Sequence, residues 1–302
     1  MQTQLRQAVV VAFGRTPYCK ARKGSFAQLH PVEYGAQTLL GVLARVPQLR
    51  PEDIGDVIMG CAMPFGVQGG NMARLIVQRA GLPDCVTAQT VNRYCSSGLQ
   101  TIATAANAIR CGEEDVVIAG GVESMSLVPM LVGAEDADPW LAEHRPEVYT
   151  TMGITAENVA RQWDISRADM DAMAVESHRR AAQAQAGGCF DGQIIPITVP
   201  GPDGGEVVVC RDEGIRPGTT AETLAGLKPC FLENGSVTAA TSSQMTDGAG
   251  FVVLMSEEKA AELGVKPLAR FVSFATGGVP AEVMGVGPIE ALPKALKKTA
   301  LA

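Results

Sequence analysis

The first 120 residues predict an α/β fold built around a mostly parallel sheet. Strand-like and helix-like segments alternate there, which is the order of a parallel sheet joined by right-handed helical crossovers. The strand-like segments are apolar runs rich in valine, as expected for strands covered on both faces. The chain has 302 residues, 46% of them hydrophobic, which is enough for two domains or one large domain with a well-formed core.

The expected elements follow one another from the N-terminus. Val9–Phe13 is a continuous apolar run that predicts a strand. Apolar side chains recur at helical spacing over Val32–Val46, and Pro47 is expected to end that helix. The alternation continues with strands over Val57–Met59, Val86–Val91 and Asp115–Ala119, and with helices over Met72–Ala80 and Ser96–Arg110.

The segment Ser96–Arg110 is unusual because its apolar residues surround most of the helix circumference. Leu99, Ile102 and Ile109 share it with four alanines. A surface helix confines its apolar residues to one stripe, so this helix is expected to be buried on nearly all sides. The alternative is an alanine-rich surface helix that forms by propensity.

The regular pattern breaks from Gly120, and a long irregular segment of this kind in an α/β chain usually carries a site. Ser166, with Asp169 three residues later, is expected to cap a helix. Within the segment we expect a loop over Gly121–Thr151, helices over Thr155–Trp163 and Ser166–Ala186, a turn-rich stretch over Gly187–Gly205, a short strand over Val207–Val209 and at most a brief helix over Ala221–Gly226.

Strand periodicity returns at Gly250–Met255 and Ala269–Ala275, and a lysine-rich helix is expected over Ile289–Leu301. The last strand and helix form a weak internal echo of Ala8–Arg15 and the helix that follows it. A second copy of the first domain would then begin near Leu268 and stop after one strand and one helix. Because two elements cannot close a sheet, the chain looks cut at its end.

Cys95 is the most informative single residue. It lies in VNRYCSSGLQTIA, where a strand end is followed by a small polar turn that opens a helix. The unpaired N–H groups of a helix N-terminus favour a negative charge, and the thiolate is the reactive form of cysteine. The polar residues Ser96, Ser97 and Gly98 would let a substrate carbonyl approach the sulfur. The alternative is a buried structural cysteine.

Composition and charge exclude several other functions. The net charge of −7 argues against nucleic acid as the main partner, and no apolar run reaches membrane-spanning length. The N-terminus lacks a signal-peptide layout, so a cytoplasmic location is expected. The eight cysteines form no CxxC pair and the three histidines no HExxH pattern, so neither a metal site nor disulfides are expected.

Several motifs occur in one order: VNRYCSSGLQ, AGGVESMS, MGITAENVA, VTAATSSQMTDGAG and MGVGP. With them the chain resembles the thiolase family of acyl-CoA acyltransferases over essentially its whole length. The resemblance implies a layered αβαβα fold whose second half is incomplete here. It places the N-terminal half at residues 1–120 plus 247–267, a CoA-binding loop domain at 121–246 and the start of a truncated C-terminal half at 268–302.

The resemblance also implies a function. Cys95 would be the nucleophile that attacks a 3-oxoacyl-CoA, releases acetyl-CoA and passes the shortened acyl group to a new CoA. Coenzyme A would be a substrate, with no other cofactor, and the full-length protein would be a homodimer or homotetramer. The implied CoA contacts are Arg216, Thr223, Phe231, Ala239 and Ser243, and the implied pocket-lining residues are Met152 and Met284.

Two departures from the family pattern change this expectation. Thr151 stands where many short-chain biosynthetic members have histidine, which favours degradative relatives that act on longer chains. The NEAF, GHP and CxGGG motifs of the family's second half do not occur in the 302 residues. Cys95 then lacks the base that would activate it, so this polypeptide is expected to have little thiolytic activity. Alternatives are a non-catalytic relative that binds acyl-CoA or lipid, and a ketosynthase of the same superfamily.

Overall fold

The computed structural model describes residues 5–130 and 134–299, which form two compact units. Unit 1 contains Met1–Pro129, Phe190–Gly214 and Met245–Val272. Unit 2 contains Met130–Cys189, Ile215–Gln244 and Ser273–Ala302. The three-part division expected from the resemblance stays a prediction.

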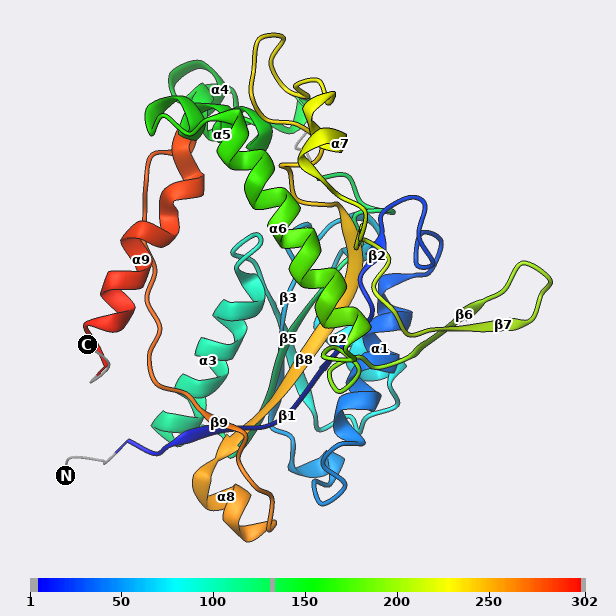
Figure 1. Cartoon of the computed structure of the whole chain (residues 1–302). Coiled ribbons are helices and arrows are strands. Elements are labelled where there is room, and N and C mark those ends of the chain that lie inside the picture. The colour runs from blue at the N-terminus through cyan, green and yellow to red at the C-terminus, as the bar shows by residue number, and fades with distance from the viewer. Residues whose placement is uncertain (1–4, 131–133, 300–302) are drawn as a thin grey trace. The chain divides into compact units, whose positions relative to one another are not determined.

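Unit 1 is built on a seven-stranded sheet (Figure 1). Its main path has the order β4-β3-β5-β8-β1-β9, and the short strand β2 pairs with β8. The strands are β1 (Ala8–Arg15), β2 (Cys19–Lys20), β3 (Asp56–Gly60), β4 (Thr87–Val91), β5 (Val116–Glu123), β8 (Thr246–Ser256) and β9 (Ala269–Arg270).

The expectation of a mostly parallel sheet is wrong at the centre. β3 pairs in parallel with β4 and β5, as predicted. β8, however, lies between β5 and β1 and runs antiparallel to both. The first four long strands therefore share one direction, but a strand from late in the sequence separates two of them.

Helices cover both faces of this sheet (Figure 1). α1 (Pro31–Leu43) and α2 (Met72–Arg79) cover one face, and α3 (Ser97–Cys111) covers the other. Side chains on β3 alternate accordingly, with Val57 and Met59 in the core under α1 and α2 and Ile58 in the core under α3. The short helices η1 (Pro51–Asp53), η2 (Gly66–Gln68) and α8 (Glu257–Glu262) complete this part of unit 1.

The prediction that the helix after Cys95 is buried on nearly all sides is wrong for this chain. Thr101, Ala105 and Ile109 of α3 are fully buried against the sheet, but Leu99 on the other side is 59% exposed. The alanines of the buried face let α3 lie close to the sheet, and Leu99 faces away from it. Gly112, with φ +79°, ends the helix in the left-handed conformation that glycine favours.

Residues 190–214 add a hairpin of β6 (Ile197–Pro200) and β7 (Glu206–Val209) to unit 1. The sequence predicts β7, but β6 falls in the turn-rich stretch Gly187–Gly205, where no strand was expected. Gln37 on α1 fixes the hairpin with two side-chain hydrogen bonds to the backbone of Thr198, of 2.9 and 3.1 Å. Because this contact comes from a distant helix, the local sequence gives little indication of β6.

Unit 2 consists of helices and connecting loops in the part of the chain that the structure describes. As predicted, Ser166 caps the longest helix, because its Oγ accepts a hydrogen bond from Asp169 N (3.1 Å). The elements are η3 (Ala134–Asp136), α4 (Pro139–His144), η4 (Pro146–Tyr149), α5 (Met152–Gln162), α6 (Arg167–Ala186), α7 (Ala221–Ala225), η5 (Ala281–Val286) and α9 (Gly287–Leu296).

The last two sequence predictions are only partly correct. The strand expected over Ala269–Ala275 is limited to Ala269–Arg270, because only these residues pair with β1. The final helix begins at Gly287 and ends at Leu296, so it is shorter than the expected Ile289–Leu301. Leu301 itself lies outside the described residues.

Candidate active site

Cys95 is exposed, on a tight turn that leads from β4 into α3. It directly precedes Ser96, the N-cap residue of α3, so the expected position at a helix N-terminus is confirmed. The residue before it, Tyr94, has φ +46°, a conformation that residues other than glycine rarely adopt. Cys95 is therefore held on a strained, ordered turn and is not a buried structural cysteine.

Hydrogen bonds within the turn stabilise this conformation. Arg93 N donates to Ser97 Oγ (2.8 Å), and Ser97 Oγ donates to Tyr94 O (2.5 Å). Ser97 N also donates to Tyr94 O (3.0 Å). Ser97 thus links the start of α3 to the two residues that precede Cys95 and closes the turn across Cys95.

The first turn of α3 packs directly on the end of β3. A Cβ atom added to Gly60 would lie 2.6 Å from Ser97 Cβ and 2.8 Å from the Ser97 carbonyl carbon. Only a glycine leaves room for backbone so near. The absence of a side chain at Gly60 therefore sets how closely the Cys95 turn approaches the sheet.

A polar network lies behind the turn at the ends of β3 and β5. The Glu123 carboxylate accepts hydrogen bonds from Ala62 N (2.7 Å) and from Gln68 Nε2 (2.6 Å). Gln68 is fully buried, and its Oε1 accepts from Ser124 N (2.5 Å). Asn92 Nδ2 donates to Ala62 O (3.0 Å), which joins this network to the turn.

The environment of Cys95 differs from that of the two buried thiols. Burial is the main cause that raises the pKa of Cys61 to about 12, and the nearby Glu123 carboxylate raises it further. Burial also raises the pKa of Cys19 strongly, with Glu213 and Asp247 as further causes. Both groups therefore stay protonated at neutral pH, where a thiol is a poor nucleophile.

The seven remaining predicted site residues all belong to unit 2 and are all exposed. Three of them gather around α5. Met152 is its first residue, and the ring of Phe231 lies so close that a Cβ atom on Gly153 would be 2.1 Å from it. Met284 lies on η5, which packs on α5 through a hydrogen bond from Asn158 Nδ2 to Glu282 O (3.0 Å).

The loop that carries Phe231 is fixed by the buried carboxylate of Glu157 on α5. This carboxylate accepts hydrogen bonds from Ser236 N (2.9 and 3.0 Å), Ser236 Oγ (3.0 Å) and Val237 N (2.8 Å). Burial alone would raise the pKa of Glu157, but these hydrogen bonds outweigh it and lower the pKa. Glu157 is therefore an ionised anchor for the segment around Phe231.

Arg216 and Thr223 lie elsewhere in unit 2. Arg216 N donates to His178 Nδ1 on α6 (3.3 Å). The Thr223 side chain accepts from Thr220 N (3.0 Å) in the capping box of α7, so this hydroxyl already has a structural role. Ala239 and Ser243 lie in the loop that follows Val237, and Ser243 Oγ donates to Gln244 O (3.4 Å).

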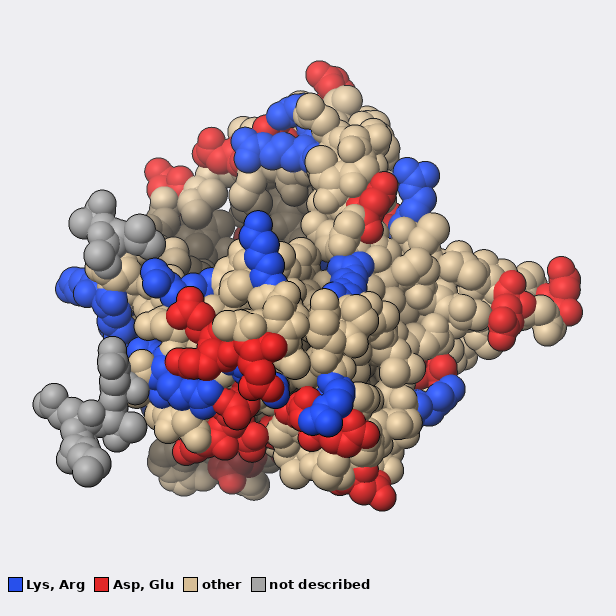
Figure 2. Space-filling model, turned by 90° about the horizontal axis from the view of Figure 1, so that it is seen from below, with Lys and Arg blue, Asp and Glu red and all other residues tan. Residues whose placement is uncertain are grey.

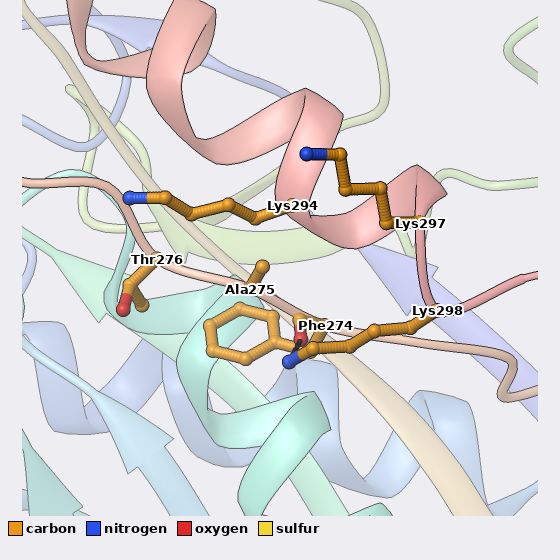
Figure 3. A pocket seen from close by; sticks show the side chains of 6 residues that line it. All are labelled: Phe274, Ala275, Thr276, Lys294, Lys297 and Lys298. Carbon is orange, nitrogen blue, oxygen red and sulfur yellow. Dashed lines mark hydrogen bonds between the residues drawn. The ribbon is translucent and has the colours of Figure 1, made fainter.

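A pocket of about 480 Å³ lies in unit 2 beside the last helix (Figure 3). None of the predicted site residues lines it. Two of its three lysines have partners, since Lys298 Nζ donates to Phe274 O (3.1 Å) and Lys294 pairs with Glu290 (3.9 Å). The lining consists of Phe274, Ala275, Thr276, Lys294, Lys297 and Lys298.

In Figure 2, basic side chains lie beside acidic ones. Pairs such as Arg50 with Asp53 (2.6 Å) and Lys259 with Glu262 (2.7 Å) illustrate this. Over residues 5–130 and 134–299, no cluster of three or more His, Cys, Asp or Glu could hold a metal ion, and no helix is long and apolar enough to cross a membrane.

Glu157, Asn92, Gln68 and Glu123 are site-supporting residues that the sequence reasoning did not single out. Glu157 and Glu123 lie inside motifs that were quoted for the resemblance, MGITAENVA and AGGVESMS. From the sequence alone, an acidic or amide residue at the end of a strand or on a helix is interpreted as a solvated side chain, because its hydrogen-bond partners are not known. Asn92 likewise lies inside VNRYCSSGLQ, so the motifs could have drawn attention to these three residues, whereas Gln68 lies outside them.

Residues 8–258 match the family model described as the thiolase N-terminal domain. The chain belongs to the thiolase family. It is 50% identical to a 3-ketoacyl-CoA thiolase of Bacillus subtilis (strain 168), over 98% of this chain and 78% of that protein. It is 43% identical to the peroxisomal 3-ketoacyl-CoA thiolase A of Mus musculus, over 99% of this chain and 72% of that protein.

The fold agrees with this membership. The crystal structure of a Bacillus anthracis acetyl-CoA acetyltransferase matches 99% of this chain and 78% of its own, with a TM-score of 0.90 and 38% identity. The mixed α/β thiolase fold is thus confirmed for this chain. The roles of the individual thiolase site residues stay predictions.

Proposed function

We propose that this thiolase-family chain acts on 3-oxoacyl-CoA in fatty acid degradation, with Cys95 as the residue that takes the acyl group. The observation that carries the proposal is the exposed Cys95 on an ordered turn at the N-terminus of α3. Similar proteins from Bacillus subtilis and Mus musculus are named 3-ketoacyl-CoA thiolases, which supports the substrate class.

In the proposed reaction the Cys95 thiolate attacks the 3-oxo carbon of the substrate. The bond between C2 and C3 breaks, its electron pair stays on C2, and protonation of C2 gives acetyl-CoA. The shortened acyl group remains on Cys95 as a thioester. A CoA thiolate then attacks this thioester and expels the Cys95 thiolate, so one difficult cleavage becomes two easier steps.

We assign substrate and CoA binding to the seven predicted site residues of unit 2, all of which are exposed. The side chains of Met152, Phe231 and Met284 around α5 offer apolar surface to the pantetheine and acyl portions. Arg216 supplies a cation for the anionic phosphate end of CoA, while Thr223, Ala239 and Ser243 supply small polar or backbone contacts. Thr151, in place of histidine, favours substrates with longer acyl chains.

We further propose that the 302-residue polypeptide by itself turns over 3-oxoacyl-CoA poorly. The sequence contains neither the GHP nor the CxGGG motif. In the family these supply the base for the nucleophile and the group that handles the proton at C2. The second half-reaction needs no carbanion, since one thioester is exchanged for another. This step should survive better than cleavage.

Exchange of isotopically labelled CoA with an unlabelled acyl-CoA tests the proposal, because it requires an acyl-enzyme but no carbon–carbon cleavage. We expect slow exchange that Cys95→Ser abolishes and that Cys111→Ser, at the other end of α3, leaves unchanged. Exchange that persists in Cys95→Ser would contradict the role of Cys95. Binding of acyl-CoA without any exchange would instead favour the non-catalytic relative.

A homodimer or homotetramer and a cytoplasmic location stay predictions. The resemblance supports the first. The similar protein of Mus musculus is named a peroxisomal enzyme, so family membership alone does not fix the compartment.

A further inference from the structure

We propose that Asn92 is a positioning residue for Cys95, and this inference rests on the proposed role of Cys95 as the nucleophile. Asn92 follows the last residue of β4 and precedes Cys95 by three positions. Its side chain connects the turn that carries Cys95 to the polar network at the ends of β3 and β5. We define this turn as Asn92–Ser97.

Both ends of the Asn92 amide are used. Asn92 Oδ1 accepts a hydrogen bond from Tyr94 N (2.7 Å), and Asn92 Nδ2 donates to Ala62 O (3.0 Å). The first contact is an Asx-type turn, in which a side chain takes the place of a backbone acceptor. The second contact fixes the direction of the amide, since its nitrogen faces a carbonyl and its oxygen faces an N–H group.

Ala62 is itself held in place. Its N–H donates to the Glu123 carboxylate (2.7 Å), and Glu123 also accepts from the fully buried Gln68 (2.6 Å). In addition, Cys61 N donates to Val91 O (3.1 Å) and extends the pairing of β3 with β4 up to Asn92. Asn92 therefore links the turn to a rigid part of the sheet and not to another loop.

The turn needs such support because of Tyr94. A non-glycine residue at φ +46° costs free energy, and it persists only where its surroundings compensate for that cost. Ser97 accepts from Arg93 N and donates to Tyr94 O, but neither contact satisfies Tyr94 N. Asn92 provides the acceptor for that N–H group and so stabilises the conformation immediately before Cys95.

The consequence for Cys95 follows from its position between Tyr94 and the N-cap Ser96. If Tyr94 relaxes to an ordinary conformation, the backbone entering α3 changes direction. The sulfur then loses its fixed position at the N-terminus of α3. Asn92 would therefore control the reactivity of Cys95 without touching a substrate.

Alkylation of the 302-residue protein by iodoacetamide tests this inference, with the rate at each cysteine read by peptide mass spectrometry. In Asn92→Ala we expect the rate at Cys95 to fall about five- to tenfold, the effect of one lost hydrogen bond. Asn92→Ser keeps a hydroxyl that can accept from Tyr94 N but does not reach Ala62 O. We expect it to restore part of the rate.

Cys111, at the C-terminal end of the same helix, is the internal reference, and Asn107→Ala, an exposed position on α3, is the matched control. In Asn92→Ala we expect the alkylation rate at Cys111 to change by no more than about twofold, the size of ordinary surface effects. In Asn107→Ala we expect the same limit for the rate at Cys95. The inference is overturned if iodoacetamide alkylates Cys95 in Asn92→Ala at the wild-type rate. It is also overturned if the alkylation rates at Cys95 and Cys111 change by the same factor, because the effect would then not be specific to the turn that carries Cys95.

The inference and the proposed function fail in different ways. If wild-type Cys95 reacts no faster than Cys111, its role as an activated nucleophile fails. If Cys95 in that case still slows selectively in Asn92→Ala, the positioning role of Asn92 stands. If the wild type exchanges CoA through Cys95 as proposed, but Asn92→Ala leaves the alkylation rate at Cys95 unchanged, only the inference fails.

Discussion

The different environments of the cysteines determine which sulfur can react. Cys95 is exposed on an ordered turn, whereas Cys61 is buried with its pKa raised to about 12, mainly by burial and then by Glu123. At about pH 8 the Cys61 thiol stays protonated, so we expect it to resist alkylation in the folded protein and to react only after denaturation. Labelling of Cys61 as fast as Cys95 under native conditions would contradict this.

Glu157 provides a second prediction at this scale, since it joins α5 to the segment around Phe231. Glu157→Gln replaces a charged acceptor by a neutral one, and we expect a loss of about 1–2 kcal/mol in the local stability of this contact. Hydrogen exchange at Ser236 and Val237 measures the effect. Glu143→Gln, an exposed position on α4, serves as the control and should leave exchange at both amides unchanged.

The same contact should depend on pH. The folded-state pKa of Glu157 lies below the ordinary value of 4.5. The ionised form therefore stabilises the contact fully above about pH 4.5. This stabilisation is lost as the pH falls further, through the folded-state pKa. A lower protection factor at Val237 on acidification, absent in Glu157→Gln, would be the signature.

The reactive residue Cys95 is easier to predict from the sequence than Asn92 and Glu157, which hold the surrounding backbone in place. Cys95 can be found because a strand end, a polar turn and an alanine-rich helix surround it in sequence. Asn92 bonds to Ala62 as well as to the neighbouring Tyr94, and Glu157 bonds to Ser236 and Val237. Ala62, Ser236 and Val237 lie far along the chain from these side chains, so no local sequence pattern identifies them as partners.

At the scale of elements, the packing of α3 on β3 depends on Gly60. Gly60→Ala would bring a Cβ atom to 2.6 Å from Ser97, so the first turn of α3 must shift. We expect a loss of about 1–3 kcal/mol in unfolding free energy together with slower alkylation of Cys95. The matched control is Gly98→Ala, next to Ser97 in the first turn of α3, where a Cβ atom meets nothing within 4 Å.

Because Gly98 lies inside α3, its replacement by alanine should stabilise the protein slightly, by up to about 1 kcal/mol. Denaturant unfolding of the two variants gives the comparison. Equal stability of Gly60→Ala and Gly98→Ala would show that the close approach of α3 to β3 has no energetic weight.

The sequence predicts individual elements better than their arrangement. Valine-rich runs and helical spacing correctly identify β1, β3, β4, β5, α1, α2 and α3. The position of β8 between β5 and β1 cannot be read from these segments, because its partners are distant in sequence. The missed strand β6 and the short β9 likewise depend on contacts with other segments.

At the scale of the whole molecule, the exposed face of α3 is the feature that differs most from the sequence expectation. Leu99 is 59% exposed although the helix was expected to be covered on nearly all sides. Exposed apolar surface of this kind favours association. We expect the 302-residue protein to self-associate at high concentration, and Leu99→Gln to reduce this with little effect on unfolding. Light scattering that shows a monodisperse monomer for the wild type would contradict this.

The central claim is that the sulfur of Cys95 accepts an acyl group from acyl-CoA. Mass spectrometry with peptide mapping after incubation with acyl-CoA tests it most directly. The account predicts one acyl adduct on Cys95, absent in Cys95→Ser and unaffected by Cys111→Ser. No adduct, or an adduct spread equally over the exposed cysteines, would contradict it.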